Sequence, residues 1–255
     1  LCRDCGFMYI NPRPMKQILW EYYRQEDCSS GSVYHALTEG SRHVRLTAER
    51  RDFLIRSVGT IHGISTSGSL LDIGCSTGDL LYSLDLPGWQ LKGLEPSGHA
   101  AKIASSRGIQ IIPQDLESAE LPEEAFDVVV CISILEHVYD IKIAMSIISS
   151  IVKCSGLVII EVPDSTKPVE QIGEFYSFEH LSNFTRNTLT RLLNDFGFEV
   201  VEFDCNVSVP NLRVCAKKCD TGIISRQGTV DDRYELLTAL SNYKQARHKL
   251  EKSII

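Results

Sequence analysis

The chain has 255 residues, 43% of them hydrophobic, and a formal net charge of −7 at pH 7. Its length suits one α/β domain with appendages, and its negative charge argues against a nucleic-acid partner, because nucleic-acid binding favours a basic surface. No apolar run approaches the roughly 18 residues that a membrane-spanning helix needs, so we expect no membrane span.

Nine cysteines with no recognisable secretory leader indicate reduced thiols in a cytoplasmic protein. Cys131 and Cys154 lie in apolar stretches, where we expect small buried side chains. Cys2 and Cys5 differ, because a C-x-x-C followed by glycine is half of a zinc-ribbon knuckle. A structural zinc site needs four ligands and no second C-x-x-C is present. We therefore predict no metal site, and an unligated cysteine pair remains one interpretation of this segment.

The stretch between residues 15 and 57 has a helical pattern. Ile18, Leu19, Tyr22 and Tyr23 are spaced for one buried face. These residues predict a helix, and its aromatic side chains either line a substrate entrance or pack the helix against a sheet.

Residues 70–81 (LLDIGCSTGDLL) predict a strand, a tight turn and a helix. Gly74 and Gly78 permit backbone conformations that a side chain forbids, and they let a ligand approach the main chain closely. The dinucleotide fingerprint G-x-G-x-x-G is absent, because Ser76 and Asp79 stand where its second and third glycines belong. The acid Asp72 suits a cationic amine better than a phosphate, so we expect an adenosine-containing cofactor other than a dinucleotide.

Four further strands follow in chain order. Residues 89–97 end near Glu95, an acid 23 positions beyond Asp72 (95 − 72), about where a ribose-binding carboxylate is expected. Residues 109–116 again end near an acid, Asp115. Residues 126–133 are almost entirely apolar, as in a parallel strand that is buried on both faces. The last strand of this series is predicted at residues 156–163, closed by a proline.

Three elements complete the chain. A helical stripe from Leu189 to Phe196 is stopped by Gly197. Residues 198–203 and 211–216 have strand patterns. From residue 230 to 255 the pattern is charged and helical, with a stripe of apolar residues at spacings of 3 and 4 that we expect to pack on the domain or on a second copy. A coiled-coil tether is the alternative for this helix. The stripe comprises Leu236, Leu237, Leu240, Tyr243, Ala246 and Leu250.

In this order, the glycine turn, Glu95, Phe126–Asp127 and Leu135–Val138 resemble the motifs of class I S-adenosylmethionine-dependent methyltransferases of the small-molecule branch. The resemblance covers roughly residues 70–217 and includes residues 174–185 (EFYSFEHLSNFT), which are similar to the family's E-H-L-x-x-F-T segment. Ser76 is a departure, since the family usually has glycine there.

The resemblance implies an α/β, Rossmann-like fold. We expect a seven-stranded, mostly parallel sheet with helices on both faces, an antiparallel last strand, an N-terminal helical cap and a C-terminal helix. We divide the chain into residues 1–57 (half of a zinc ribbon and the cap), 58–220 (the cofactor-binding domain) and 221–255 (the C-terminal helix). Similar methyltransferases carry a full zinc ribbon, which is the second interpretation of Cys2 and Cys5.

The resemblance also implies S-adenosylmethionine as the cofactor and S-adenosylhomocysteine as its product. Asp72 and the turn backbone are expected at the methionine end, Glu95 at the ribose, and Asp115 with Leu116 at the adenine. Ser133 and Leu135, at the end of the strand predicted at residues 126–133 and just after it, are expected beneath the sulfonium. The expected cofactor-binding residues are Asp72, Gly74, Cys75, Ser76, Gly78, Glu95, Pro96, Asp115, Leu116, Ser133, Leu135 and His137.

Methyl transfer to a hydroxyl or a carbon requires the removal of a proton, and histidine is the usual base. We assign this role to His180, because the segment after the fifth strand faces the cofactor's methyl in proteins that this chain resembles; positioning and structural roles for His180 remain open. His137 is the competitor, with a supporting role beside the cofactor as its alternative. Tyr176 and Asn183 are expected to contact the substrate.

The expected acceptor is a small polar molecule. Sugars and nucleotide sugars are candidates, because the ribbon-like start and the segment around His180 resemble sugar methyltransferases. An NAD-dependent epimerase or reductase is disfavoured by Ser76 and by the absence of a Tyr-x-x-x-Lys pair. The remaining alternative is a non-catalytic domain that binds the cofactor or docks a partner. We expect a monomer or a homodimer, with tethering through the C-terminal helix as a further option.

Overall fold

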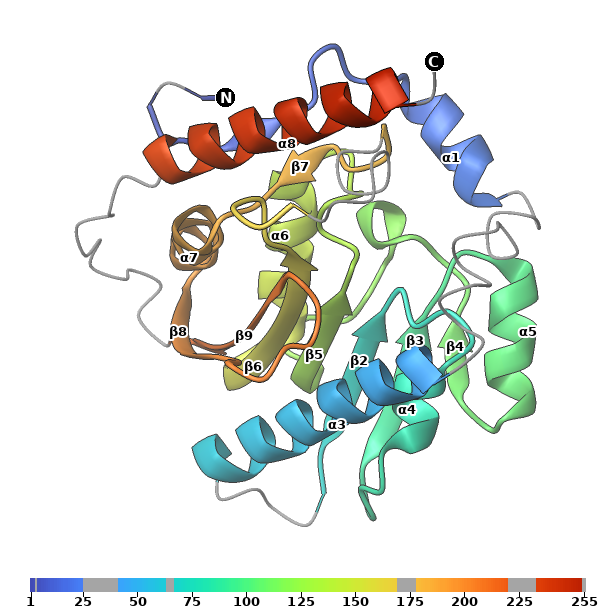
Figure 1. The fold of residues 1–255 in the computed structure, drawn as a ribbon. Helices are drawn as coiled ribbons and strands as arrows, with labels where there is room; N and C mark the ends of the chain where they lie inside the picture. Colours follow the sequence, from blue (N-terminus) through green and yellow to red (C-terminus); the bar gives the residue numbers. More distant parts are fainter. Residues whose placement is uncertain (3, 25–40, 63–66, 169–177, 220–232, 254–255) are drawn as a thin grey trace.

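A seven-stranded sheet forms the centre of the protein (Figure 1). The computed structural model describes residues 1–2, 4–24, 41–62, 67–168, 178–219 and 233–253. The strand order is β4-β3-β2-β5-β6-β9-β8. The strands are β2 (Ser69–Ile73), β3 (Gln90–Leu94), β4 (Gln110–Ile112), β5 (Phe126–Ile132), β6 (Val152–Pro163), β8 (Phe198–Phe203) and β9 (Asn211–Lys218).

The strand directions match the expected class. Neighbouring strands from β4 to β6 are parallel, whereas β9 runs antiparallel to both β6 and β8. In the register of the sheet, Asp72 of β2 lies opposite Gly93 of β3 and Val130 of β5. The carboxyl ends of these three central strands therefore lie at one edge of the sheet, which is where open α/β sheets bind their ligands.

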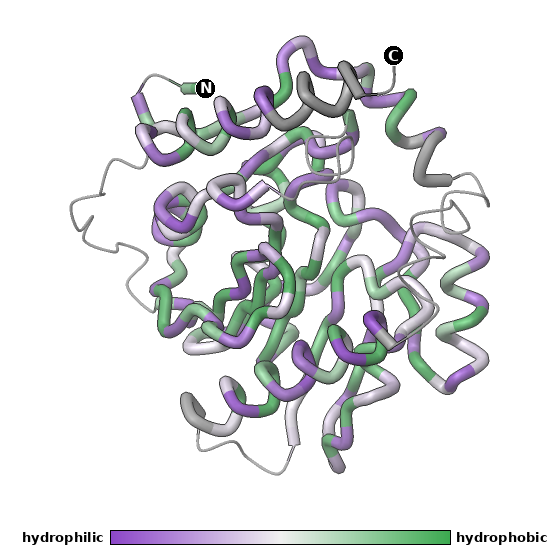
Figure 2. Tube along the Cα trace, viewed as in Figure 1, coloured by the Kyte–Doolittle hydropathy of each residue, from purple (hydrophilic) through white to green (hydrophobic). Residues whose placement is uncertain are grey.

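Helices cover both faces of the sheet (Figure 1). One face packs against α6 and α7, and the other packs against α3 and α4, so the apolar residues form two clusters. Figure 2 shows the hydrophobic residues concentrated along the central strands. The helices are α1 (Lys16–Arg24), α3 (Ser41–His62), α4 (Asp79–Ser83), α5 (Gly98–Ser106), α6 (Ile141–Ile151), α7 (Arg186–Asp195) and α8 (Arg233–Ser253), with a 3-10 turn η1 at Leu116–Ser118.

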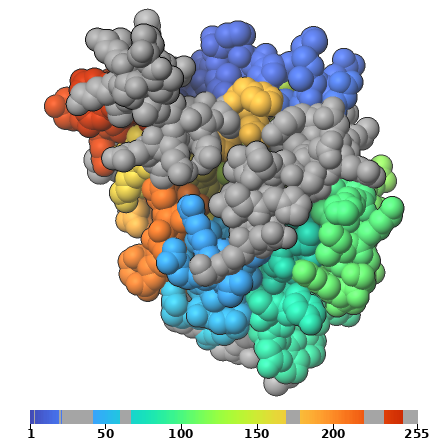
Figure 3. Space-filling view, turned by 45° about the vertical axis from the view of Figure 1, so that its right-hand side comes forward, coloured from blue at the N-terminus to red at the C-terminus, as the bar shows by residue number. Residues whose placement is uncertain are grey.

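Helix α3 is part of the packed domain. Its residues Phe53, Leu54 and Val58 are at most 3% exposed and share a cluster with Leu70 and Val128 of the sheet. Burial of each such side chain contributes roughly 1.5–3 kcal/mol. In Figure 3, α3 (blue) and the surface of α4 (teal) adjoin each other. The helix continues through residue 57, and the division of the chain at residues 57 and 220 stays a prediction.

Local side-chain bonds define where several helices begin. The Ser97 hydroxyl accepts a bond from the backbone N–H of Ala100 at the start of α5, and Asp140 caps α6. Thr185 and Thr188 form a reciprocal capping box at the start of α7. Such caps satisfy N–H groups that have no partner within the helix.

The N-terminal segment pairs with a distant part of the chain. Strand β1 (Met8–Tyr9) runs antiparallel to β7 (Ser182–Asn183), and the Ile10 N–H donates to the Leu181 carbonyl at 3.1 Å. The sequence patterns did not predict this pairing. It anchors the segment that carries His180 to the start of the chain.

The cysteines only partly follow the expectation. Cys131 is fully buried, but Cys154 is exposed. The prediction for Cys154 was wrong because this residue precedes Leu157, where β6 resumes its regular pairing with β5. Cys2 and Cys5 lie in a turn closed by a bond between the Gly6 N–H and the Cys2 carbonyl at 3.1 Å. Their zinc-ribbon interpretation stays a prediction.

Helix α8 packs on the domain. Leu236 is fully buried and Ala239 is 8% exposed, whereas Leu237 is 54% exposed, so the expected stripe was wrong for Leu237. The side chains of Ala246 and Leu250 lie outside the described residues. Among the described helices, none combines the length and the apolar character that crossing a membrane requires. The oligomeric state and a tethering role of α8 stay predictions.

Candidate functional site

The glycine turn after β2 has the backbone that its sequence predicts. Gly74, Ser76 and Gly78 have φ angles of 70°, 50° and 78°. A Cβ atom on Gly74 would lie 2.1 Å from Cδ1 of Ile134, so no side chain fits there without displacement. Ser76 adopts a left-handed conformation that favours glycine, which accounts for the family's preference at this position.

Two buried acids flank this turn. Asp72 is 4% exposed, and burial, reinforced by Glu95 and opposed by Arg50, raises its pKa to about 7. Glu95 follows β3, and its carboxylate accepts bonds from the backbone N–H groups of Ser76 (2.9 Å) and Ser97 (2.8 Å). Burial also raises the pKa of Glu95, although these two bonds oppose the rise. Carboxylates such as these accept hydrogen bonds from an amine or from the two hydroxyls of a ribose.

The other expected cofactor residues follow the ends of neighbouring strands. Asp115, after β4, accepts a bond from the Ser118 N–H at 3.1 Å and so caps η1. Ser133, after β5, has a φ of 54°. Cys75 is buried, and burial raises the pKa of its thiol, so the thiol stays protonated near neutral pH. Of the remaining expected residues, the structure buries Leu116 and Leu135 and exposes Pro96.

A second group of polar side chains lies beside the β5 exit. Glu136 and His137 lie two and three positions after Ile134, whose side chain adjoins Gly74 of the glycine turn, and His180 lies in the segment before β7. The imidazole rings of His137 and His180 meet edge to face, with 4.8 Å between their centroids. The structure therefore brings the two histidines singled out in the sequence into contact.

His137 is held in a defined state. Its Nδ1 lies 3.2 Å from the Glu179 carbonyl oxygen, which only accepts hydrogen bonds, so Nδ1 carries the proton. Desolvation, together with neighbouring His180, lowers the pKa of His137 to about 3. An imidazole with so low a pKa takes up no proton near neutral pH, which disfavours His137 as the general base.

The two expected substrate contacts differ in what the structure describes. Asn183 is 8% exposed, and its Nδ2 donates to the His180 carbonyl at 3.3 Å. It thereby positions the backbone of His180. Tyr176 lies outside the described residues.

The sequence analysis missed a buried ionic network at the end of β6. Glu161 is fully buried and accepts bonds from Arg50 (2.6 Å), Arg213 (2.6 Å) and Asn211 (3.0 Å). Burial alone would raise the pKa of Glu161, but the two guanidinium groups hold it at about 2. The available signal was an acid inside an otherwise apolar strand, since a buried charge needs a partner. No local pattern identified Arg50, whose charge also acts on Asp72.

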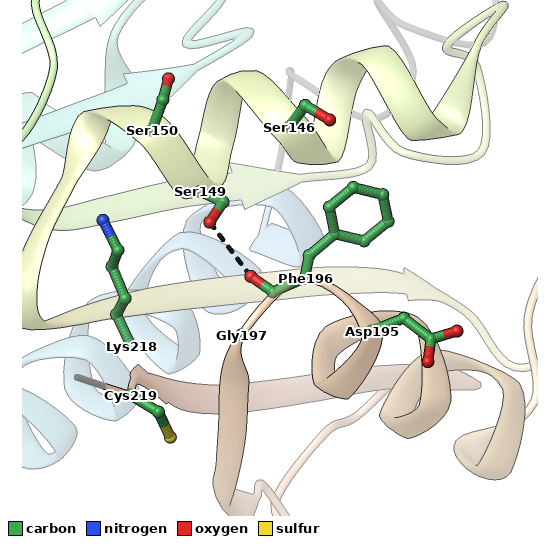
Figure 4. Close-up of a pocket in the computed structure, with 8 residues that line it drawn as sticks. All are labelled: Ser146, Ser149, Ser150, Asp195, Phe196, Gly197, Lys218 and Cys219. Atoms are coloured by element: carbon green, nitrogen blue, oxygen red, sulfur yellow. Dashed lines mark hydrogen bonds between the residues drawn. The ribbon is translucent and has the colours of Figure 1, made fainter. Parts of the chain in front are cut away.

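A surface pocket lies away from these residues (Figure 4). It is lined by the end of α6, the α7–β8 turn and the end of β9, and the Ser149 hydroxyl donates to the Phe196 carbonyl at 3.0 Å. Lys218, which lines it, bonds the carbonyl of Val152, whose partner Phe126 is the first residue of β5. The pocket is therefore at the amino end of β5, opposite the glycine turn, and the described residues that line it include no cluster of catalytic groups.

This sheet order, with a glycine turn after β2 and a buried acid after β3, defines the Rossmann-like fold of class I S-adenosylmethionine-dependent methyltransferases. The chain belongs to the methyltransferase domain family, whose model matches residues 45–203. The prediction of this family from the sequence is confirmed, and so is the cofactor class.

Individual curated relatives share only 25–32% sequence identity with the chain. The chain is 25% identical over 211 residues to the C-methyltransferase NovU of Streptomyces niveus, covering 79% of this chain and 46% of the relative. It is 32% identical over 118 residues to a ubiquinone biosynthesis O-methyltransferase of Chromobacterium violaceum, covering 43% of this chain and 48% of the relative. The chain thus spans about half the length of these curated relatives.

Solved structures support the fold. Magnesium protoporphyrin IX methyltransferase from Synechocystis, crystallised with bound S-adenosylhomocysteine, matches with a TM-score of 0.60 at 15% identity, covering 80% of this chain and 100% of that one. A possible histamine N-methyltransferase from Thermotoga maritima matches with a TM-score of 0.56 at 19% identity, covering 78% and 99%. At these identities the likeness concerns the fold alone.

Proposed function

We propose that the chain transfers a methyl group from S-adenosylmethionine to a hydroxyl or carbon of a small polar acceptor, a sugar or nucleotide sugar being the class we favour. The observation that carries this proposal is the position of His180, which lies against His137 just beyond the residue that contacts the glycine turn. Similarity to a C-methyltransferase and to O-methyltransferases supports an acceptor atom of either type.

The residues around the turn fit the cofactor. Gly74 has the positive φ that the tight turn needs, and Asp72 offers a buried carboxylate to a cationic amine. Glu95, whose two oxygens already accept backbone bonds, has further lone pairs for a ribose diol. S-adenosylmethionine supplies a methyl group that is already activated on its sulfonium, so the protein has to align the acceptor and exclude water.

His180 is the proposed general base. Transfer to a hydroxyl or a carbon leaves a proton on the acceptor, and a ring nitrogen of His180 takes it. The Asn183 amide holds the backbone carbonyl of His180, and His137 packs against the ring. Tyr176 and Asn183 are the proposed acceptor contacts. The proposed role of Asn183 is supported by its position beside His180, where it is buried.

The proposal is tested by measuring release of S-adenosylhomocysteine with nucleotide sugars, phenols and small acids as acceptors. His180→Ala is expected to keep the affinity for S-adenosylhomocysteine and to lose at least 100-fold in turnover, about the contribution of a general base. His99→Ala, which removes an exposed histidine of α5, is the matched control and is expected to keep its turnover. Unchanged turnover of His180→Ala would refute the base assignment.

The same assay separates the alternative function. Tight binding of the cofactor without turnover on any acceptor class favours a non-catalytic domain that binds the cofactor or docks a partner enzyme. Turnover on phenols alone would keep the methyltransferase reaction and overturn the proposed sugar acceptor.

A further inference from the structure

The contact between the two histidines includes a third group, the carboxylate of Glu136. One ligand atom each from Glu136, His137 and His180 lie within 4.8 Å of one another. Two imidazoles and one carboxylate are a donor set that suits late first-row divalent cations such as Zn²⁺ and Co²⁺. We name these three residues the Glu-His-His cluster.

His137 has the outer bond that is typical of a metal ligand. Because its Nδ1–H donates to the Glu179 carbonyl at 3.2 Å, the neutral ring presents the lone pair of Nε2 on its other side. That Nε2 lies 4.0 Å from Oε1 of Glu136. Metal-bound histidines nearly always donate their second ring N–H to a carbonyl or a carboxylate, which fixes the tautomer and the ring.

Glu136 provides an independent observation. Glu136 is 2% exposed, and its Oε2 has no hydrogen-bond partner among the residues that the structure describes. A buried carboxylate oxygen without a partner is costly, because it has lost its water without a replacement. A cation bound between Glu136 and the two histidines would restore the missing interaction.

The backbone of the cluster is held on each side. The Glu136 carbonyl accepts a bond from the Ser182 N–H at 3.1 Å, and the His180 carbonyl accepts one from Asn183 at 3.3 Å. Around a tetrahedral zinc ion with bonds of about 2.0 Å, ligand atoms lie about 3.3 Å apart. Binding therefore requires side-chain rotations on this backbone that shorten the present separations, which are at most 4.8 Å, by about 1.5 Å or less.

We propose that the Glu-His-His cluster binds one Zn²⁺-like divalent cation, with a fourth position left open for water. The effect on catalysis rests on the proposed function. A nitrogen lone pair of His180 that holds a cation does not accept a proton, so an occupied site blocks the proposed base.

The test is a titration of the untagged chain with CoCl₂, followed by visible absorption and by calorimetry. Cys2→Ser and Cys5→Ser are introduced first, so that the cysteine pair contributes no binding. One equivalent of Co²⁺ is expected, with d–d absorption bands that disappear when ZnCl₂ displaces it. His180→Asn and Glu136→Gln are each expected to weaken Co²⁺ binding at least tenfold.

His99→Asn serves as the matched control, since it removes an exposed imidazole outside the cluster. S-adenosylhomocysteine binding and the thermal midpoint show that each variant is folded. Absence of a bound equivalent, or unchanged Co²⁺ affinity in both cluster variants, would overturn the proposal. Because this readout needs no acceptor, its failure is distinct from a failure of the proposed methyl transfer.

Discussion

The raised pKa of Asp72 is expected to make cofactor affinity depend on pH near neutrality. Asp72 is expected to pair with the cofactor's amine in its ionised form, and its pKa without cofactor is about 7. Its ionised fraction then falls from about three-quarters at pH 7.5 to about one-tenth at pH 6.0. The affinity for S-adenosylhomocysteine is therefore expected to fall about eightfold between these values, or about 1.3 kcal/mol.

Calorimetry in two buffers of different ionisation enthalpy measures this effect, because binding near pH 6 should release close to one proton. Asp72→Asn is expected to bind more weakly and to lose the pH dependence between pH 6.0 and 7.5. Asp85→Asn, at an exposed position after α4, is the matched control and should retain the dependence of the unaltered chain.

An ordinary aspartate has a pKa of about 3.9 and stays more than about 99% ionised at both pH values. A change in affinity of less than twofold would therefore refute the argument. Either Asp72 would then have ordinary acidity despite its burial, or its carboxylate would make no bond to the cofactor.

Two further predictions concern stability. Glu161→Gln is expected to lower the free energy of unfolding at pH 7 by about 3 kcal/mol, measured by urea denaturation, because it leaves the buried Arg213 partly unpaired. The control Glu123→Gln, at an exposed site, should cost little stability. Equal losses in the two variants would contradict this reasoning. Since the pKa of Glu161 is lowered from 4.5 to about 2, its contribution is complete above pH 5 and is lost as the pH falls toward 2, a loss that Glu161→Gln should not show. Ser76→Gly should raise the thermal midpoint, by relieving about 1 kcal/mol of left-handed backbone strain at φ 50°; a lower midpoint would show that Ser76 makes a compensating contact.

The sheet and the cofactor side were predictable because their signals are local. A buried parallel strand needs an apolar run, and β5 has one from Phe126 to Ile132. The turn at Gly74 needs residues that tolerate a positive φ, and the acids follow directly after their strands. Each signal lies within about ten residues, so one sequence was sufficient to recognise it.

The ionic network at β6 lacked such a signal. Glu161 lies 111 positions from Arg50 and 52 from Arg213 along the chain. An acid in an apolar strand requires a partner, but the sequence holds 26 lysines and arginines and no local rule selects among them. The choice depends on α3 packing its Phe53 face onto the sheet, which is a property of the tertiary fold.

The difference between the two sides of the site has a consequence for specificity. The proposed cofactor side comes from short strand–turn units, whereas the proposed acceptor side joins the segment around His180 to β1 near the start of the chain and to Glu136 after β5. Changes in these distant segments alter the acceptor side while the glycine turn is unaffected. We infer that such a separation lets one cofactor-binding fold serve both C- and O-methyltransferases, which are found among the relatives of this chain. We therefore expect variants of the His180 segment and of β1 to change which acceptor is used, and substitutions in the turn to change cofactor affinity with every acceptor alike.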